Sequence, residues 1–158
     1  ETANEMADAV FSESPKSDFV VMAAAVADFT PAEKHKEKIK KNKEGLEIQL
    51  VPTVDILASL GAARNDEQIL VGFAAETNDL EKNARNKLES KGVDLIVAND
   101  VSAANVGFDY DTNAAILFDY MGKKTELPLA DKREIAQAVL DVALKLKADK
   151  HEESGGNQ

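Results

Sequence analysis

Short apolar runs that alternate with segments of helical periodicity constrain the fold more than any other feature of the 158-residue sequence. Runs of this length without polar interruption are typical of strands that are covered on both faces. Strands that alternate with helices predict an α/β sheet with helices packed on it. The buried strands expected are Asp18–Ala27, Gln68–Ala75, Val93–Ala98 and Ala114–Phe118, the last paired with Lys124–Leu127.

Capping residues and a glycine mark the ends of the expected helices. The last helix turns Ile135, Val139, Val142 and Leu146 to one side, as a helix packed on a sheet does. The first helix is expected to begin with a Thr2–Glu5 capping box, and the last with an Asp131–Glu134 capping box. The two helices between them are expected from Thr53 to Ala63 and from Thr77 or Asn78 to Gly92.

The region between the first strand and the second helix is expected to be extended, at Glu37–Lys41 and Leu46–Val51, with a turn at KNKEG. We interpret residues 1–150 as one domain, and the polar, glycine-containing residues 151–158 as a disordered tail. Because a complete α/β domain usually opens with a buried strand, and this chain opens in a helix, we expect the chain to begin inside its domain.

Composition excludes several classes of function. The formal charge of −10 argues against general binding to nucleic acid, which requires a basic face. There is no cysteine, which excludes disulfides and cysteine-ligated metals and fits a reducing, cytoplasmic location. No apolar run approaches the ~18 residues of a membrane-spanning helix.

Six lysines nevertheless follow Asp28 between Lys34 and Lys43. One interpretation is a solvated loop. The other is a group of cations over a polyphosphate, because lysine is a flexible point charge suited to phosphate. In an extended segment, Lys36, Lys38 and Lys40 would share a side.

Lys87 and Lys91 lie four residues apart on one helix face, where like charges are destabilising. They are either a tolerated surface pair or the two sides of an anion site. Arg85 differs, because Glu81 and Glu89 flank it at the spacing of helical ion pairs.

Polar residues follow the strands at the edge where ligands of α/β sheets bind. Asp28, Asn99 and Asp100 could be caps or ligand contacts, and Phe73 could be core or a ring that packs a base. Neither histidine has a plausible catalytic triad around it. The two glycine-rich phosphate-binding patterns, GxGxxG and GxxxxGK followed by Ser or Thr, do not occur in the sequence.

Seven segments together give the chain a family resemblance. The sequence resembles phosphopantothenoylcysteine synthetases, also called phosphopantothenate–cysteine ligases, from about Thr2 to Leu146. In many bacteria these form the second half of a bifunctional coenzyme A biosynthesis protein. The segments are AAVADF followed by EKIKK, VDIL, VGFAAETN, ARNKLESKG, DLIVANDVS and GFDYDTNAAILF, in the same order as in the family.

The resemblance implies a fold class and an activity. The fold would be α/β, a Rossmann-like, mostly parallel sheet with helices on both faces, incomplete at the N-terminus. The enzyme would join 4′-phosphopantothenate to cysteine through an acyl-cytidylate formed from CTP, with Mg²⁺ carried by the triphosphate and no dedicated metal site. The complete enzyme would be a homodimer, and the missing N-terminal segment could belong to another chain.

The resemblance also assigns residues. Lys38 would be the catalytic residue, and the residues after it would form a closing flap: Ile39, Lys40, Lys41, Asn42, Lys43 and Glu44. VDIL departs from the family's usual NPDI. The nucleotide contacts would be Met22, Ala23, Ala24, Asp28, Lys38, Val54, Asp55, Ile56, Leu57, Phe73, Lys87 and Lys91.

Three other functions fit the residues less well. A nucleotide-binding fragment that is inactive on its own would follow from the missing N-terminal segment. A nicotinamide-dependent oxidoreductase would require a glycine fingerprint that the sequence lacks. A structural oligomerisation module would leave the two lysines at positions 87 and 91 without a role.

Overall fold

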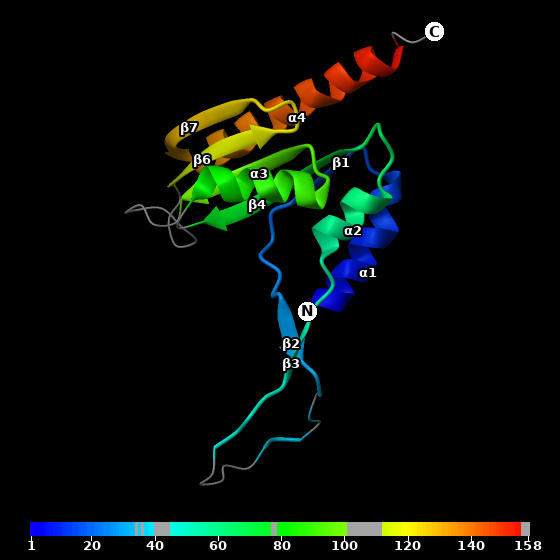
Figure 1. The fold of residues 1–158 in the computed structure, drawn as a ribbon, viewed down its shortest axis with the longest axis vertical. Coiled ribbons are helices and arrows are strands. Elements are labelled where there is room, and N and C mark those ends of the chain that lie inside the picture. The colour runs from blue at the N-terminus through cyan, green and yellow to red at the C-terminus, as the bar shows by residue number, and fades with distance from the viewer. Residues whose placement is uncertain (34, 36, 40–44, 77–78, 101–111, 156–158) are drawn as a thin grey trace.

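The computed structural model describes residues 1–33, 35, 37–39, 45–76, 79–100 and 112–155 (Figure 1). A short 3₁₀ helix, Ser14–Lys16, precedes the first strand. The other elements are α1 (Ala3–Glu13), β1 (Phe19–Met22), β2 (Phe29–Pro31), β3 (Leu50–Pro52), α2 (Ile56–Ala63), β4 (Ile69–Glu76), α3 (Leu80–Lys91), β5 (Leu95–Asp100), β6 (Thr112–Asp119), β7 (Lys124–Asp131) and α4 (Lys132–Gly155).

The main sheet has five strands in the order β1-β4-β5-β6-β7. The pairs β1/β4 and β4/β5 are parallel, whereas β5/β6 and β6/β7 are antiparallel. The sequence-based expectation of a mostly parallel sheet is therefore wrong, and the sheet is mixed. Two pairings produce this: β6 returns antiparallel beside β5, and a short turn, in which Gly122 adopts φ +88°, joins β6 to β7, because a tight hairpin can only join antiparallel strands.

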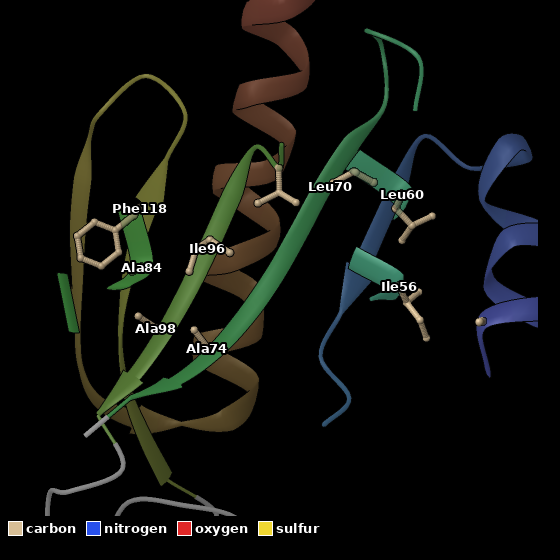
Figure 2. Close-up of a cluster of buried hydrophobic side chains, with 10 residues drawn as sticks. Ile56, Leu60, Leu70, Ala74, Ala84, Ile96, Ala98 and Phe118 are labelled. Carbon is tan, nitrogen blue, oxygen red and sulfur yellow. The ribbon is translucent and has the colours of Figure 1, made fainter. Parts of the chain in front are cut away.

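Helices cover both faces of this sheet, as the sequence predicted. One core joins buried residues of α1, α2 and α3 to β4, β5 and β6, including Leu60, Leu70 and Phe118 (Figure 2). The other core joins α4 to the same strands. In α4 the predicted face is confirmed: Ile135, Val139 and Leu146 are buried, and Val142 packs partly against them.

Local hydrogen bonds explain where the helices begin. At α1 the predicted capping box is present: Glu5 N–H donates to the Thr2 hydroxyl over 3.2 Å, and Thr2 N–H donates to the Glu5 carboxylate over 2.8 Å. Before α4 the Asp131 carboxylate accepts a hydrogen bond from the Arg133 N–H at 2.6 Å. The predicted capping box would instead have used the N–H of Glu134, one residue later. At its other end α4 continues to Gly155, into the segment that the sequence assigned to a tail.

Two other expected helix starts shift. The α2 helix begins at Ile56, and its cap is Asp55, not Thr53. The α3 helix begins at Leu80, and residues 77 and 78, the expected start, lie outside the described residues. Gly92 ends α3 in a left-handed conformation, as predicted.

The first strand is shorter than expected. β1 ends at Met22, and residues 23–27, which were expected to continue it, leave the sheet. The chain then enters β2, which was not predicted and pairs antiparallel with β3. This two-stranded arm projects away from the main sheet (Figure 1). The expected extended segment Leu46–Val51 contains only the start of β3, and the expected turn before it lies largely outside the described residues.

Buried charges fix α4 to the amino ends of the parallel strands. The Asp94 side chain, 1% exposed, forms ion pairs with Arg64 and, over 2.9 Å, with Lys150 of α4. It also accepts a hydrogen bond from the Leu70 N–H at 2.8 Å. Because an unpaired buried charge is costly, these contacts hold β4, β5 and α4 together at this end. The opposite end of the strands stays available for a ligand.

Candidate functional site

A cleft of about 530 Å³ lies at the carboxyl ends of β1 and β4, beside the start of α2 and the face of α3. It is where α/β sheets usually bind their ligands. Its lining residues are Met22, Ala24, Ala25, Val26, Ala27, Asp28, Thr53, Val54, Asp55, Ile56, Leu57, Phe73, Ala74, Ala75, Lys87, Lys91 and Ile96.

The cleft brings together every predicted nucleotide-contact residue except Ala23 and Lys38. Lys38 is exposed and follows β2 in the arm, and Ile39 beside it is 46% exposed. The remaining predicted flap residues, Lys40 to Glu44, lie outside the described residues.

Backbone and hydroxyl contacts hold one wall of the cleft. The Thr53 hydroxyl donates to the Ala27 carbonyl over 2.6 Å, and the Thr53 N–H donates to the Asp28 carbonyl over 2.9 Å. These bonds tie the segment after β1 to the chain that enters α2. Thr53 thus connects the end of β3 to the segment after β1, and it does not cap α2, whose N-cap is Asp55.

Phe73, Ala74 and Ala75 of β4 form the floor. Phe73 packs partly against the α4 core, which confirms the core interpretation, and it also lines the cleft; its packing against a base stays a prediction. A side chain at Gly72 would place its Cβ 2.6 Å from Leu57, which shows how closely α2 lies on β4. The floor and the start of α2 therefore give the cleft an apolar side that suits a flat ring.

The α3 side of the cleft carries charge. Lys87 and Lys91 both line the cleft, but Lys91 is not the unpaired cation that its helix spacing suggested, because it forms an ion pair with Asp55. The second Asp55 oxygen accepts from the Ala58 N–H at 3.0 Å and so caps α2. Arg85 is paired with Glu81, as predicted, and stacks over the Phe118 ring, with its guanidinium carbon 5.2 Å from the ring centroid.

Electrostatics keep Asp55 ionised. Partial burial raises the pKa of Asp55, but the hydrogen bonds from Lys91 and the Ala58 N–H, with the charge of Lys91, outweigh it and leave the pKa below its ordinary value. The cleft therefore contains a carboxylate held between a lysine and a helix N-terminus.

Gly61 explains how Lys91 reaches Asp55. A Cβ at Gly61 would overlap the carbonyl oxygen of Lys91 and approach that of Gly92 at 3.1 Å, so α2 can lie against the end of α3 only because residue 61 is glycine. This contact places the last residue of α3 beside the last turn of α2, and from there the Lys91 side chain reaches Asp55 at the N-terminus of the same helix.

The sequence did not reveal the side-chain role of Asp55, which had been assigned only through the VDIL segment. The signal was present, since an aspartate directly before ILASL is a standard N-cap. Of the other ambiguous polar residues, Asn99 has a buried side-chain oxygen without a hydrogen-bond partner, and nothing is described for the Asp100 side chain.

Two features are absent from the described residues. These residues contain no group of three or more His, Cys, Asp or Glu side chains that could hold a metal ion. Within the same residues, no helix is both long enough and apolar enough to cross a bilayer. With two lysines and an apolar floor, the cleft can accept an anion attached to a flat apolar group.

The fold and the cleft define a class: a mixed α/β domain with a cation-bearing cleft at the carboxyl ends of its parallel strands. Residues 1–146 match the family described as DNA/pantothenate metabolism flavoprotein C-terminal domain, and the chain belongs to this family.

The chain is similar to several known proteins. It is 49% identical over 140 residues to the coenzyme A biosynthesis bifunctional protein CoaBC of Bacillus subtilis, covering 89% of this chain and 34% of that protein. For the CoaBC of Escherichia coli K12 the identity is 43% over 143 residues, covering 89% and 35%. The crystal structure of the C-terminal domain of a CoaBC superposes with a TM-score of 0.74 at 35% identity, covering 94% of this chain and 64% of that one. The chain thus spans about a third of these curated relatives.

Proposed function

We propose that the cleft binds CTP and that the chain is the phosphopantothenate–cysteine ligase part of a coenzyme A biosynthesis protein. The observation that supports this most is the gathering of the motif residues in one cleft at the ligand-binding edge of the sheet. Family membership and the similarity to CoaBC proteins point to the same pathway.

The geometry suits a nucleoside triphosphate. The phosphates would lie between Lys87, Lys91 and the N-terminus of α2, where lysine charges and backbone N–H groups stabilise anions. The base would lie over the apolar floor near Phe73. Backbone groups at Met22, Ala24 and the start of α2 would set its orientation.

The proposed reaction needs no enzyme nucleophile. The carboxylate of 4′-phosphopantothenate attacks the α-phosphorus of CTP, and pyrophosphate leaves. The amine of cysteine then attacks the acyl carbon of the acyl-cytidylate, and CMP leaves as the amide forms. Both steps depend on holding reactants together and on cations where negative charge grows.

Lys38 is the residue we propose for the first step. It stands in the arm, outside the cleft lining, so it would have to move over the α-phosphate when the segment after it closes. Mg²⁺ would enter on the triphosphate, because magnesium usually binds through substrate phosphates in sites of this kind. The complete enzyme is proposed to be a homodimer.

Calorimetric titration of the purified chain with CTP, ATP and NADH tests the binding proposal. We expect CTP to bind, and Lys87→Gln to weaken binding by about tenfold or more, because a charge-assisted contact contributes roughly 1.5–3 kcal/mol. Glu89→Gln, on the same helix but outside the cleft, is the control. Preference for NADH, or unchanged CTP affinity in Lys87→Gln, would contradict the assignment.

Pyrophosphate release tests catalysis separately. With CTP and phosphopantothenate, the complete enzyme should release pyrophosphate, and Lys38→Gln should slow this much more than it weakens CTP binding. CTP binding by the present chain without pyrophosphate release would instead identify it as a nucleotide-binding part that is inactive alone.

A further inference from the structure

We propose that the Asp55 carboxylate is an internal competitor for the anion that binds in the cleft, and that a polyphosphate binds by taking Lys91 away from Asp55. This inference rests on the proposed function, because it takes the cleft as the triphosphate site. It adds a residue that sets the affinity of that site.

The position of the Asp55 carboxylate is that of a bound anion. One of its oxygens pairs with the ammonium group of Lys91, and the other accepts from the Ala58 N–H at the N-terminus of α2 over 3.0 Å. A lysine and a helix N-terminus are the groups that bind phosphate oxygens in proteins. Without a ligand, the protein therefore fills its own anion site.

The competitor is open to exchange. The side chains of Asp55 and Lys91 are 49% and 28% exposed, and both line the cleft. An ion pair this open to solvent adds little to stability, so a ligand with several negative charges can replace it. The low pKa of Asp55 means that the carboxylate competes throughout the neutral range.

The backbone around the pair is held in place, so the exchange involves the side chains. Gly61 fixes α2 against the carbonyl end of α3, next to Lys91. Lys91 has a long flexible stem, and Lys87 lies one turn earlier and lines the same cleft. A polyphosphate beside Lys87 is thus within reach of Lys91 once that side chain leaves Asp55.

The test uses inorganic tripolyphosphate and CTP, titrated calorimetrically into the full chain. Asp55→Asn removes the charge but keeps an oxygen that can cap α2. We expect it to bind tripolyphosphate about two- to fivefold more tightly than the unchanged chain, the range that an exposed ion pair gives. Lys91→Gln should bind tripolyphosphate more weakly than the unchanged chain. Adding Asp55→Asn to Lys91→Gln should restore little of the lost affinity.

Glu89→Gln is the matched control, because it removes a carboxylate two residues from Lys91 that does not line the cleft. Any of four results would overturn the competitor role: an unchanged or weaker Asp55→Asn affinity, an equal gain in Glu89→Gln, an equal gain in the Lys91→Gln background, or no tripolyphosphate binding by any variant. Failure of the proposed function looks different: the coupling persists, but CTP binds no better than tripolyphosphate.

Discussion

Among single residues, Gly61 has the most demanding position, because it sets the separation of α2 and α3. Alanine normally stabilises a helix interior by about 1 kcal/mol relative to glycine. Here its methyl group would overlap the end of α3, so we expect Gly61→Ala to lower the free energy of unfolding by roughly 1–3 kcal/mol. Urea unfolding measures this change.

Ala62→Gly, on the exposed side of the same helix, is the control and should lose only the ordinary helix preference. Stabilisation by Gly61→Ala would show that α2 and α3 can separate freely. In that case the ion pair between Asp55 and Lys91 would not depend on this close approach.

The site also shows what sequence can predict at the residue scale. Lys87 and Lys91 could be singled out because they are neighbours on one helix, where the spacing rule is local. The pairing of Lys91 with Asp55 could not, because these residues are 36 positions apart and meet only through packing. Residue spacing predicts repulsion between side chains of the same helix, but it does not predict contacts with the capping residue of another helix.

At the scale of elements, Asp55 governs the start of α2. Asp55→Ala removes the N-cap, and we expect a loss of about 1 kcal/mol in the free energy of unfolding, the usual cost of such a change. Thr53→Ala is the comparison, since Thr53 contacts Ala27 instead of capping the helix. A larger effect of Asp55→Ala on helix content than of Thr53→Ala, read by circular dichroism during unfolding, would support the assignment.

The pH dependence of stability follows from the same carboxylate. Folding lowers the pKa of the Asp55 carboxyl group. Its contribution to the free energy of unfolding is therefore complete above the pKa of this group in the unfolded chain, about 4, and is lost as pH falls through its pKa in the folded chain. Asp55→Asn cannot titrate. The stability advantage of the unchanged chain over this variant should therefore be constant near pH 7 and shrink below about pH 4, in denaturant unfolding at several pH values. A gap that widens on acidification would have the wrong sign.

Elements were predictable where the pattern was local. The α1 capping box, the glycine end of α3 and the apolar face of α4 each depend on residues within a few turns, and each is confirmed. Strand direction was not predictable in this way, because the mixed sheet depends on how β6 returns beside β5. The alanine-rich run at residues 23–27 was also wrongly predicted as strand, since it is apolar but leaves the sheet, and residues 24–27 line the cleft.

At the scale of the whole molecule, β1 lies at one edge of the sheet, and no strand among the described residues pairs with its outer side. Val21 in this strand is 41% exposed. Open strand edges favour pairing with another chain. We therefore expect the purified chain to self-associate with rising concentration in sedimentation experiments, and Val21→Lys to reduce this.

Leu144→Lys is the matched control, because Leu144 is also exposed but belongs to α4 and not to the edge strand. Equal loss of self-association in both variants would indicate non-specific hydrophobic association instead of pairing at the β1 edge. A chain that stays monomeric at high concentration would show that the β1 edge is sufficiently protected by its own neighbours.

The double covering of β5 has a consequence for measurement. Leu95 to Ala98 are fully buried, flanked by β4 and β6 and covered by both cores. Their amide hydrogens should exchange with deuterated water only when the whole domain opens, so their exchange rate reports global unfolding. A ligand at a hundred times its dissociation constant should slow that exchange about a hundredfold, while amides in the arm of β2 and β3 keep their rate. Hydrogen exchange of β5 can therefore measure binding in the cleft without any assay of catalysis.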